Sequence, residues 1–325
     1  MPQAENNPRP TRRHALAASL AAAAGGMALG AGLQLAAAGD ARRALRVAHL
    51  TDMHVQPELR AGEGYAAALD SLERLDPPPA FIMTGGDHVM EVFSQSRARA
   101  REQYDLYARV LAAHTKLPVY PVMGNHDVWG WGREIIDRKA EGYGKAMALD
   151  RLRMRAPYYS FDAGGWHIVI LDSIAARDRT YFGHLGDEQT DWLKQDLKQT
   201  GPTVPVCVFS HIPILSVSVF FDGDERLGKT DWSVPDAWMH RDARELLDLF
   251  DQYNVPVLAS GHIHLVDRCD YRGHAFVCNG AVCGDWWAGP RQQFPEGYAV
   301  LDLYPDGTFE NRYVTFGWDA KKKAD

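Results

Sequence analysis

The sequence predicts an α/β sandwich built from two mixed sheets with helices on the outside. Short apolar strands alternate with helical segments from residue 45 to residue 258, and from residue 268 onward only short strands and turns follow. Such alternation, followed by a β-rich end, is typical of this fold class. No internal repeat or low-complexity linker interrupts the chain after residue 38. The sequence therefore predicts one domain over residues 39–325.

The individual elements are predicted from apolar periodicity and from the residues that interrupt it. The strands predicted as single apolar runs are 45–50, 81–84, 119–123, 204–209 and 255–258. A strand pair is predicted at 158–161 and 166–171, with its turn at Gly164-Gly165. The predicted helices are 64–75, 97–116, 187–198 and 242–253. Three consecutive prolines, 77–79, end the first helix, and residues 129–157 are predicted to form an irregular insertion over a site.

Composition limits the classes of function. The 325 residues are 46% hydrophobic, which is ordinary for a globular protein and argues against disorder. The formal net charge is −7, and residues 1–38 carry three arginines and one glutamate, so the rest of the chain carries −9. An acidic body is a poor partner for nucleic acid or for an anionic membrane. If the substrate is an anion, a bound metal would supply the attracting field.

Residues 1–38 have the features of an export signal. A polar segment ends in Arg12-Arg13, an Ala/Gly-rich stretch follows, and residues 36–38 supply the small residues of an A-x-A cleavage site. The paired arginines resemble a twin-arginine (Tat) signal, which predicts a bacterial protein carried by the Tat machinery to the periplasm or secreted. A membrane anchor is the alternative, but a segment made mostly of Ala and Gly partitions weakly. No other run is long and apolar enough to span a bilayer, so we expect no stable membrane anchor.

The four cysteines form no CxxC pair, which argues against a zinc ribbon or a thioredoxin-type site. Cys207 lies in an apolar strand and is predicted to be in the core. Cys269, Cys278 and Cys283 are close in sequence, so export would permit a disulfide between two of them.

Polar side chains that suit metals follow five of the predicted strands. In chain order they are Asp52 and His54, then Asp87, then Asn125, His126 and Asp127, then His211, and finally His262 and His264. The residues two apart in the first and last groups share one side of an extended chain, so both can face one ion. Strand ends of α/β sheets are the usual place for sites. Carboxylate, amide and imidazole ligands suit Zn, Mn or Fe, and the lack of thiolates argues against a structural zinc site.

The order of these blocks, D-x-H, G-D, G-N-H-D, H and G-H-x-H, resembles the calcineurin-like metallophosphoesterases. The resemblance implies a four-layer α/β/β/α sandwich with a two-metal site. It implies that one metal is held by Asp52, His54 and His264. It implies that the second is held by Asn125, His211 and His262, with Asp87 bridging both. His126 would face the phosphate and the leaving group, and Asp127 would orient it; no residue is assigned to an organic cofactor.

The implied function is hydrolysis of small-molecule phosphate mono- or diesters. Two cations polarise a phosphoryl group, and a hydroxide that bridges them is a nucleophile at neutral pH, because metal binding lowers the pKa of water. A positioned acid such as His126 then protonates the leaving group. A cyclic-nucleotide phosphodiesterase shares this linear arrangement and is one alternative. A metal-binding protein without catalysis is another, which the filled ligand positions and the filled catalytic position disfavour.

One block departs from the family pattern. Family members often show G-D-x-x-D/E, whereas here Met90 stands at the last position and Glu91 comes one place late. His88, next to the predicted bridging Asp87, either supports the site from behind or is purely structural. The tryptophans that adjoin the site blocks in sequence are predicted either to wall a substrate pocket or to pack in the core or a lid; they are Trp129, Trp131, Trp286 and Trp287.

Overall fold

A computed structural model of the chain describes residues 45–133, 137–221 and 233–320. The predicted signal, residues 1–38, lies outside the described residues. A five-stranded sheet contains β1 (Leu45–Leu50), β2 (Phe81–Thr84), β3 (Val119–Pro121), β12 (Gly297–Leu303) and β13 (Phe309–Thr315). A six-stranded sheet contains β4 (Tyr159–Ala163), β5 (Trp166–Ile170), β8 (Val206–Phe209), β9 (Val257–Ser260), β10 (Val266–Tyr271) and β11 (His274–Asn279). Strands β6 (Ile174–Arg177) and β7 (Thr180–Gly183) form a separate hairpin.

Five α-helices and two short 3-10 helices accompany these strands in the described part of the chain. The α-helices are α1 (Ala61–Leu72), α2 (Arg97–His114), α3 (Ala146–Arg151), α4 (Asp187–Thr200) and α5 (Ala243–Phe250). The 3-10 helices are η1 (Asn125–Asp127) and η2 (Ser218–Phe220). Among the described residues, no helix has both the length and the apolar character needed to cross a bilayer.

Both sheets are mixed, as predicted. Their orders are β13-β12-β1-β2-β3 and β10-β11-β9-β8-β5-β4. Strands β1, β2 and β3 run parallel, and β12 and β13 continue that sheet in antiparallel pairing. In the second sheet β5, β8, β9 and β11 run parallel, and the edge strands β4 and β10 are antiparallel to their neighbours. Parallel pairing brings the carboxyl ends of neighbouring strands to one edge of each sheet.

Three apolar clusters show that the fold has four layers. Adjacent residues of β1 point to opposite faces, and Val47 packs between the two sheets with Ile168.

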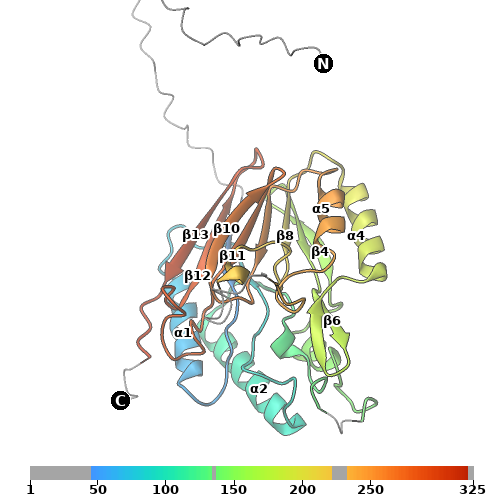
Figure 1. Cartoon of the computed structure of the whole chain (residues 1–325). Coiled ribbons are helices and arrows are strands. Elements are labelled where there is room, and N and C mark those ends of the chain that lie inside the picture. The colour runs from blue at the N-terminus through green and yellow to red at the C-terminus, as the bar shows by residue number, and fades with distance from the viewer. Residues whose placement is uncertain (1–44, 134–136, 222–232, 321–325) are drawn as a thin grey trace, which may run out of the picture. The chain divides into compact units, whose positions relative to one another are not determined.

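 Ala48, on that other face, packs with Tyr65 of α1 and Tyr104 of α2. The outer face of the six-stranded sheet is covered in the same way by α4 and α5, whose Leu193 and Phe250 pack with Val208 of β8. Figure 1 shows α1 and α2 together on one side of the sheets and α4 and α5 together on the other. The predicted four-layer α/β/β/α sandwich is confirmed.

Several elements differ from the sequence-based prediction. Helix α1 begins at Ala61 and ends at Leu72, earlier at both ends than the predicted 64–75. Helix α3 lies inside the segment predicted to be irregular, and the β6–β7 hairpin was not predicted. The last four strands join both sheets, so the β-rich end is part of the same sandwich.

The start of α1 was misplaced because it contains two glycines, which lower helix propensity. Gly64 leaves room for the ring of Trp287, since a Cβ at this position would lie 2.1 Å from a ring carbon. Trp287 is 2% exposed, and its indole Nε1 donates at 3.1 Å to the carbonyls of Met53 and His54. Gly64 therefore provides the space in which Trp287 packs beneath the segment that carries Asp52 and His54.

We expect Gly64→Ala to destabilise the protein by about 1–3 kcal/mol, the usual effect of overpacking a core. The measurement is urea unfolding. Gly62→Ala is the matched control in the same helix, because its Cβ would meet Leu106 at an ordinary 3.4 Å. That substitution should leave stability unchanged or raise it slightly. Equal stability of the two variants would contradict this account of Trp287 packing.

All four cysteines are free, so the disulfide that export would permit is not formed in this structure. The register of the β10–β11 pair explains this. Cys278 lies opposite Asp267, and Cys269 lies opposite Phe276, so neither cysteine faces another across the pair. Cys207 is fully buried between the two sheets, as predicted.

A buried histidine with two carboxylate partners lies on the outer face of the six-stranded sheet. His167 of β5 contacts Asp162 of β4 at 2.7 Å through Nδ1 and Asp196 of α4 at 2.8 Å through Nε2. Burial disfavours the charged ring, but the carboxylates of Asp196 and Asp162 outweigh it and raise the pKa of His167 above its ordinary 6.5. The protonated ring can donate to both carboxylates at once.

A raised folded-state pKa gives stability that is complete below the unfolded value of about 6.5 and is lost as the pH rises through the folded value. We therefore expect the stability difference between wild type and His167→Gln to be largest near pH 6 and to shrink toward pH 9. Urea unfolding across this range measures it. The double variant Asp162→Asn/Asp196→Asn keeps the imidazole and should lose the same pH-dependent part. A difference that grows with pH would contradict the assignment.

Candidate metal centre

The predicted donors meet at the carboxyl ends of strands from both sheets. Asp52 and His54 follow β1, Asp87 follows β2, and Asn125 follows β3. From the second sheet, His211 follows β8, and His262 and His264 follow β9. Each donor lies a few residues beyond its strand, where the chain leaves the sheet and can turn its side chain toward the space between the two sheet edges.

The backbone at this edge is unusual. Left-handed φ values are found at five of the donors: 55° at Asp52, 43° at His54, 52° at Asp87, 71° at His262 and 62° at His264. Such conformations are uncommon for residues other than glycine. They persist where the surrounding structure enforces them, and they cluster at functional sites. This observation supports a binding role for the strand ends independently of the side chains.

One group of donors forms around Asp52. The Nε2 atoms of His54 and His264 lie 3.1 Å apart. His264 Nε2 is 3.2 Å from Asp52 Oδ1, and His54 Nε2 is 3.7 Å from the same oxygen. Asp52 Oδ1 is buried and accepts no hydrogen bond from the described residues, whereas Oδ2 accepts from Thr51 Oγ1 at 2.6 Å and from the His262 amide at 2.9 Å. One oxygen is thus fixed by the protein and the other is left for a ligand.

A second group forms around His211. Its Nε2 atom lies 3.1 Å from Asn125 Oδ1 and 3.2 Å from His262 Nδ1. Asp87 joins the two groups, since its Oδ2 is 3.2 Å from His211 Nε2 and 3.7 Å from His54 Nε2. Its other oxygen, Oδ1, accepts from the His126 amide at 2.8 Å. The seven predicted ligands are therefore brought together in the two sets that the resemblance implied.

These spacings fit metal coordination. A metal–nitrogen bond is about 2.0–2.1 Å long, so neighbouring ligand atoms on one ion lie roughly 3 Å apart. Most of the donor–donor distances above are 3.1–3.2 Å. These clustered His and Asp side chains are suited to hold divalent metal ions.

Backbone carbonyls orient all four imidazoles from behind. His54 Nδ1 contacts the Met90 carbonyl at 3.3 Å, and His211 Nδ1 contacts that of Gly85 at 2.8 Å. His262 Nε2 lies 2.9 Å from the Ala237 carbonyl, and His264 Nδ1 lies 2.9 Å from that of Gly284. A ring nitrogen that donates to a carbonyl leaves the other nitrogen unprotonated and available to a metal.

The charge states of His54, His262 and Asp87 suit ligation, because metals bind neutral imidazole and ionised carboxylate. Burial lowers the pKa of His54 to about 4 and that of His262 to about 3, so both rings are neutral. Burial opposes ionisation of Asp87, but the facing rings of His211 and His126 outweigh it and lower its pKa below the usual range. Burial likewise disfavours the charged His211 ring, yet Asp87 and Asp52 raise its pKa to about 9. A cation in this position would take over the role of that proton.

His126 lies at the wall of the site, with a ring nitrogen within 4.8 Å of ligand atoms of His54 and Asp87. Its Nδ1 contacts the Met90 carbonyl at 2.6 Å, and its ring meets that of His54 edge to face at 4.8 Å between centroids. The ring lines a cavity that Asp87 and His264 also line. The backbone carbonyl of Met90 therefore supports the ring of His126. Met90 stands where the family pattern often has an acidic residue, and the sequence did not predict this contact.

Asp127 was predicted to orient the His126 ring, and this part of the prediction is wrong. Its carboxylate accepts from the amides of Asp87 at 3.0 Å, His88 at 2.9 Å and Gly124 at 2.9 Å. His88 Nδ1 donates to it as well, at 2.9 Å. The 3-10 turn η1 directs Asp127 back toward its own strand end while His126 points outward. Asp127 is therefore a positioning residue for the loop of Asp87, and His88 supports that loop with it.

The four tryptophans divide between the two roles left open. Trp286 lines the cavity, with its ring 4.1 Å from that of His54 and 4.9 Å from that of His264 between centroids. Trp129 and Trp287 are buried in the core beneath the helices, and Trp131 packs against that core.

Besides Ile263, which lies between the predicted ligands His262 and His264, three residues line the cavity that the sequence did not single out: Tyr181, Trp238 and Arg291. Tyr181 lies on the unpredicted β6–β7 hairpin, and Arg291 follows a segment without regular periodicity. No motif surrounds them, so no sequence signal could have placed them here. A larger hollow of about 1010 Å³ lies along α1 and α2, and none of the predicted ligands lines it.

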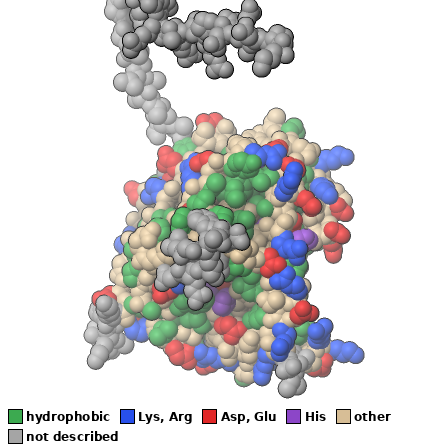
Figure 2. All heavy atoms as spheres, viewed as in Figure 1, with side chains coloured by type: hydrophobic (Ala, Val, Ile, Leu, Met, Phe, Trp, Pro, Cys, Tyr) green, Lys and Arg blue, Asp and Glu red, His purple; other side chains and the backbone are tan. Residues whose placement is uncertain are grey.

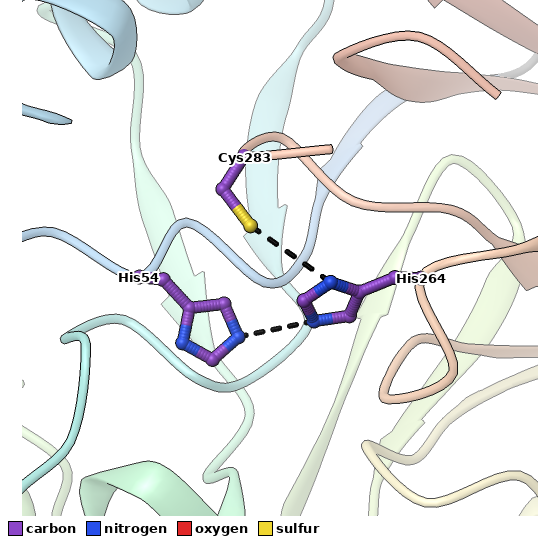
Figure 3. Close-up of side chains that lie close together, drawn as sticks. All are labelled: His54, His264 and Cys283. Atoms are coloured by element: carbon purple, nitrogen blue, oxygen red, sulfur yellow. Dashed lines mark hydrogen bonds between the residues drawn. The ribbon is translucent and has the colours of Figure 1, made fainter. Parts of the chain in front are cut away.

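Cys283 is a further neighbour of the site. Figure 3 shows its thiol on one side of the His264 ring while His54 faces the other nitrogen. The sulfur is 3.9 Å from His264 Nδ1, the nitrogen that contacts the Gly284 carbonyl, and it is therefore on the opposite side from Asp52. Burial raises the pKa of the Cys283 thiol, so the protonated thiol is the favoured form.

The fold and the donor sets together define an α/β sandwich with a metal-binding edge formed by both sheets. The profile of the calcineurin-like phosphoesterase family matches residues 45–266. The chain belongs to this family. The confirmed resemblance covers every strand end that carries a predicted ligand.

Named relatives show the range of this family. The chain is 28% identical to a bovine serine/threonine-protein phosphatase, CPPED1, over 70% of this chain and 66% of that protein. The chain thus spans slightly less than two thirds of that relative. It is 22% identical to a probable cyclic nucleotide phosphodiesterase of Psychrobacter, over 80% of this chain and 70% of that protein. A zebrafish (Danio rerio) dimetal phosphatase shares the fold, with a TM-score of 0.59 and 14% identity, over 85% of this chain and 100% of that one.

Proposed function

We propose that this protein hydrolyses phosphate esters of small molecules with two bound metal ions. Asp52, His54 and His264 hold one ion, Asn125, His211 and His262 hold the other, and Asp87 contacts both. The observation that carries this proposal is the position of Asp87 Oδ2 between His54 Nε2 and His211 Nε2. The donor set suits Fe, Mn or Zn.

Bound metal ions supply polarisation of the phosphoryl group and a lowered pKa for water. The protein positions the ester and supplies the proton that the leaving group takes up. Hydrolysis joins a water oxygen to phosphorus, breaks the ester P–O bond and delivers a proton to the departing alkoxide. His126 is placed for that delivery, because the Met90 carbonyl holds Nδ1 and leaves Nε2 for the leaving group.

Metal analysis combined with an ester assay tests the proposal. Protein stripped with a chelator should lose hydrolysis of p-nitrophenyl phosphate and of bis-p-nitrophenyl phosphate, and addition of Mn, Zn or Fe should restore it. Titration of the metal should give two equivalents per chain. Full activity in metal-free protein, or saturation at one equivalent, would contradict the two-metal assignment.

A cyclic-nucleotide phosphodiesterase is the second candidate, because the Psychrobacter relative is described as a probable enzyme of this kind. Cyclic AMP assayed beside the two nitrophenyl esters separates the candidates. Preference for cyclic AMP over both esters would select the second.

We further propose that residues 1–38 are a twin-arginine export signal and that the protein works in the periplasm or is secreted. The support is the sequence itself: Arg12-Arg13, the Ala/Gly-rich stretch and the small residues 36–38. Replacing both arginines with lysine in a bacterial host should leave the precursor in the cytoplasm. Unchanged export of that variant would contradict the proposal.

A further inference from the structure

The cavity beside the metal donors is small. It has a volume of about 170 Å³ and is lined by Asp87, His126, Tyr181, Trp238, His262, Ile263, His264, Trp286 and Arg291. Pockets that enclose a drug-sized ligand have volumes of about 300–1,000 Å³. As lined by the described residues, the cavity beside the metal donors has room for a phosphoryl group and a small part of an alcohol. A diester, which carries an alcohol on two of its phosphoryl oxygens, needs more room than a monoester.

Arg291 contributes a guanidinium to the lining of this cavity. The other lining residues are a carboxylate, imidazoles, aromatic rings and one aliphatic side chain. The protein outside residues 1–38 has a net charge of −9, so this guanidinium is a local positive charge on an acidic protein. Figure 2 shows acidic and basic side chains interspersed over the described surface of this face. A guanidinium matches the geometry of phosphate oxygens through paired N–H donors.

Arg291 is also held in place. Its amide donates to the Phe294 carbonyl at 2.9 Å, and the Phe294 amide donates back to the Arg291 carbonyl at 2.9 Å. Its Nη1 donates to Asp285 Oδ1 at 2.9 Å. Asp285 directly precedes Trp286, whose ring contacts His54 and His264. The chain that covers the metal donors therefore also fixes the guanidinium, and a fixed charge needs little reorganisation when an anion binds.

We propose that Arg291 binds the phosphoryl group of the substrate and makes the site selective for phosphate monoesters over diesters. A monoester has a second ionisation near pH 6, so it carries close to two negative charges at neutral pH, whereas a diester carries one. The extra anionic oxygen is the group that a guanidinium would neutralise. Charge and cavity volume thus favour the same class of substrate. This inference rests on the proposed ester hydrolysis at the same site.

The test is Arg291→Gln, compared with wild type on p-nitrophenyl phosphate and bis-p-nitrophenyl phosphate. Loss of a hydrogen bond to a charged group is expected to lower kcat/KM for the monoester by about 10- to 100-fold. The diester should fall much less, so the monoester-to-diester ratio falls at least about tenfold. Calorimetric titration of the metal-loaded protein with inorganic phosphate should show binding weakened by a similar factor, independently of turnover.

Arg272→Gln is the matched control, because Arg272 pairs with Asp248 and Asp251 at the far end of β10 from His264. It should leave the ratio and phosphate binding as in wild type. Arg291→Lys keeps the charge without the planar fork and should give an intermediate ratio; it also serves if Arg291→Gln does not fold. An equal fall for both esters, or unchanged phosphate binding, overturns the inference. If wild type hydrolyses neither ester, ester hydrolysis is wrong, and phosphate binding alone then decides whether Arg291 holds the anion.

Discussion

Asp87→Asn is expected to lower kcat/KM for phosphate esters by at least about 10³-fold, because bound metals contribute several kcal/mol of transition-state stabilisation. Asp87 Oδ2 is the atom that approaches both donor sets, at 3.7 Å from His54 Nε2 and 3.2 Å from His211 Nε2. Asparagine keeps the shape of the side chain and an oxygen for the His126 amide. It removes the charge that two cations would share. Metal content should therefore fall together with the rate.

The measurements are inductively coupled plasma mass spectrometry and the monoester assay on the same protein preparation. Asp162→Asn is the matched control, since it removes a carboxylate from the His167 pair on the outer face of the six-stranded sheet. That control should keep both the metals and the rate. Asp87→Asn protein that retains its metals and its rate would show that Asp87 does not join the two donor sets.

The strand ends were predictable because their chemistry is local. Each donor follows an apolar run directly, and a buried parallel strand is visible in a sequence as such a run. Strands β1 and β2 have the predicted bounds, Leu45–Leu50 and Phe81–Thr84. The order of the five blocks then identified the family, whose four-layer sandwich agrees with the two sheets and outer helices predicted from the alternation of strands and helices.

The parts that could not be predicted depend on contacts between distant segments. Gly64 lies within α1 because Trp287 needs its space, and nothing near Gly64 in the sequence indicates that contact. Asp127 follows His126 directly, yet the 3-10 turn sends it to the amides of Asp87 and His88. Arg291 reaches the cavity through a segment without periodicity. In each case the partner is set by tertiary packing rather than by neighbours in the chain.

The rings of the site explain why His126 and the metal ligands should respond differently to substitution. His126 Nδ1 is held by the Met90 carbonyl at 2.6 Å, and the ring packs against those of His54 and Trp286 at the wall of the cavity. We therefore expect His126→Ala to retain its metals and to lose about 10²–10⁴-fold in rate, the usual contribution of a general acid.

The size of that loss should depend on the leaving group. Nitrophenolate departs readily without a proton, whereas an aliphatic alkoxide needs one, so His126→Ala should reduce hydrolysis of an alkyl phosphate more than that of p-nitrophenyl phosphate. His114→Ala is the matched control, because His114 is a surface residue of α2 that contacts Asp70 at 2.8 Å. It should leave both rates unchanged. Equal losses for the two esters, or metal content that falls in step with the rate, would place His126 among the ligands instead of at the leaving group.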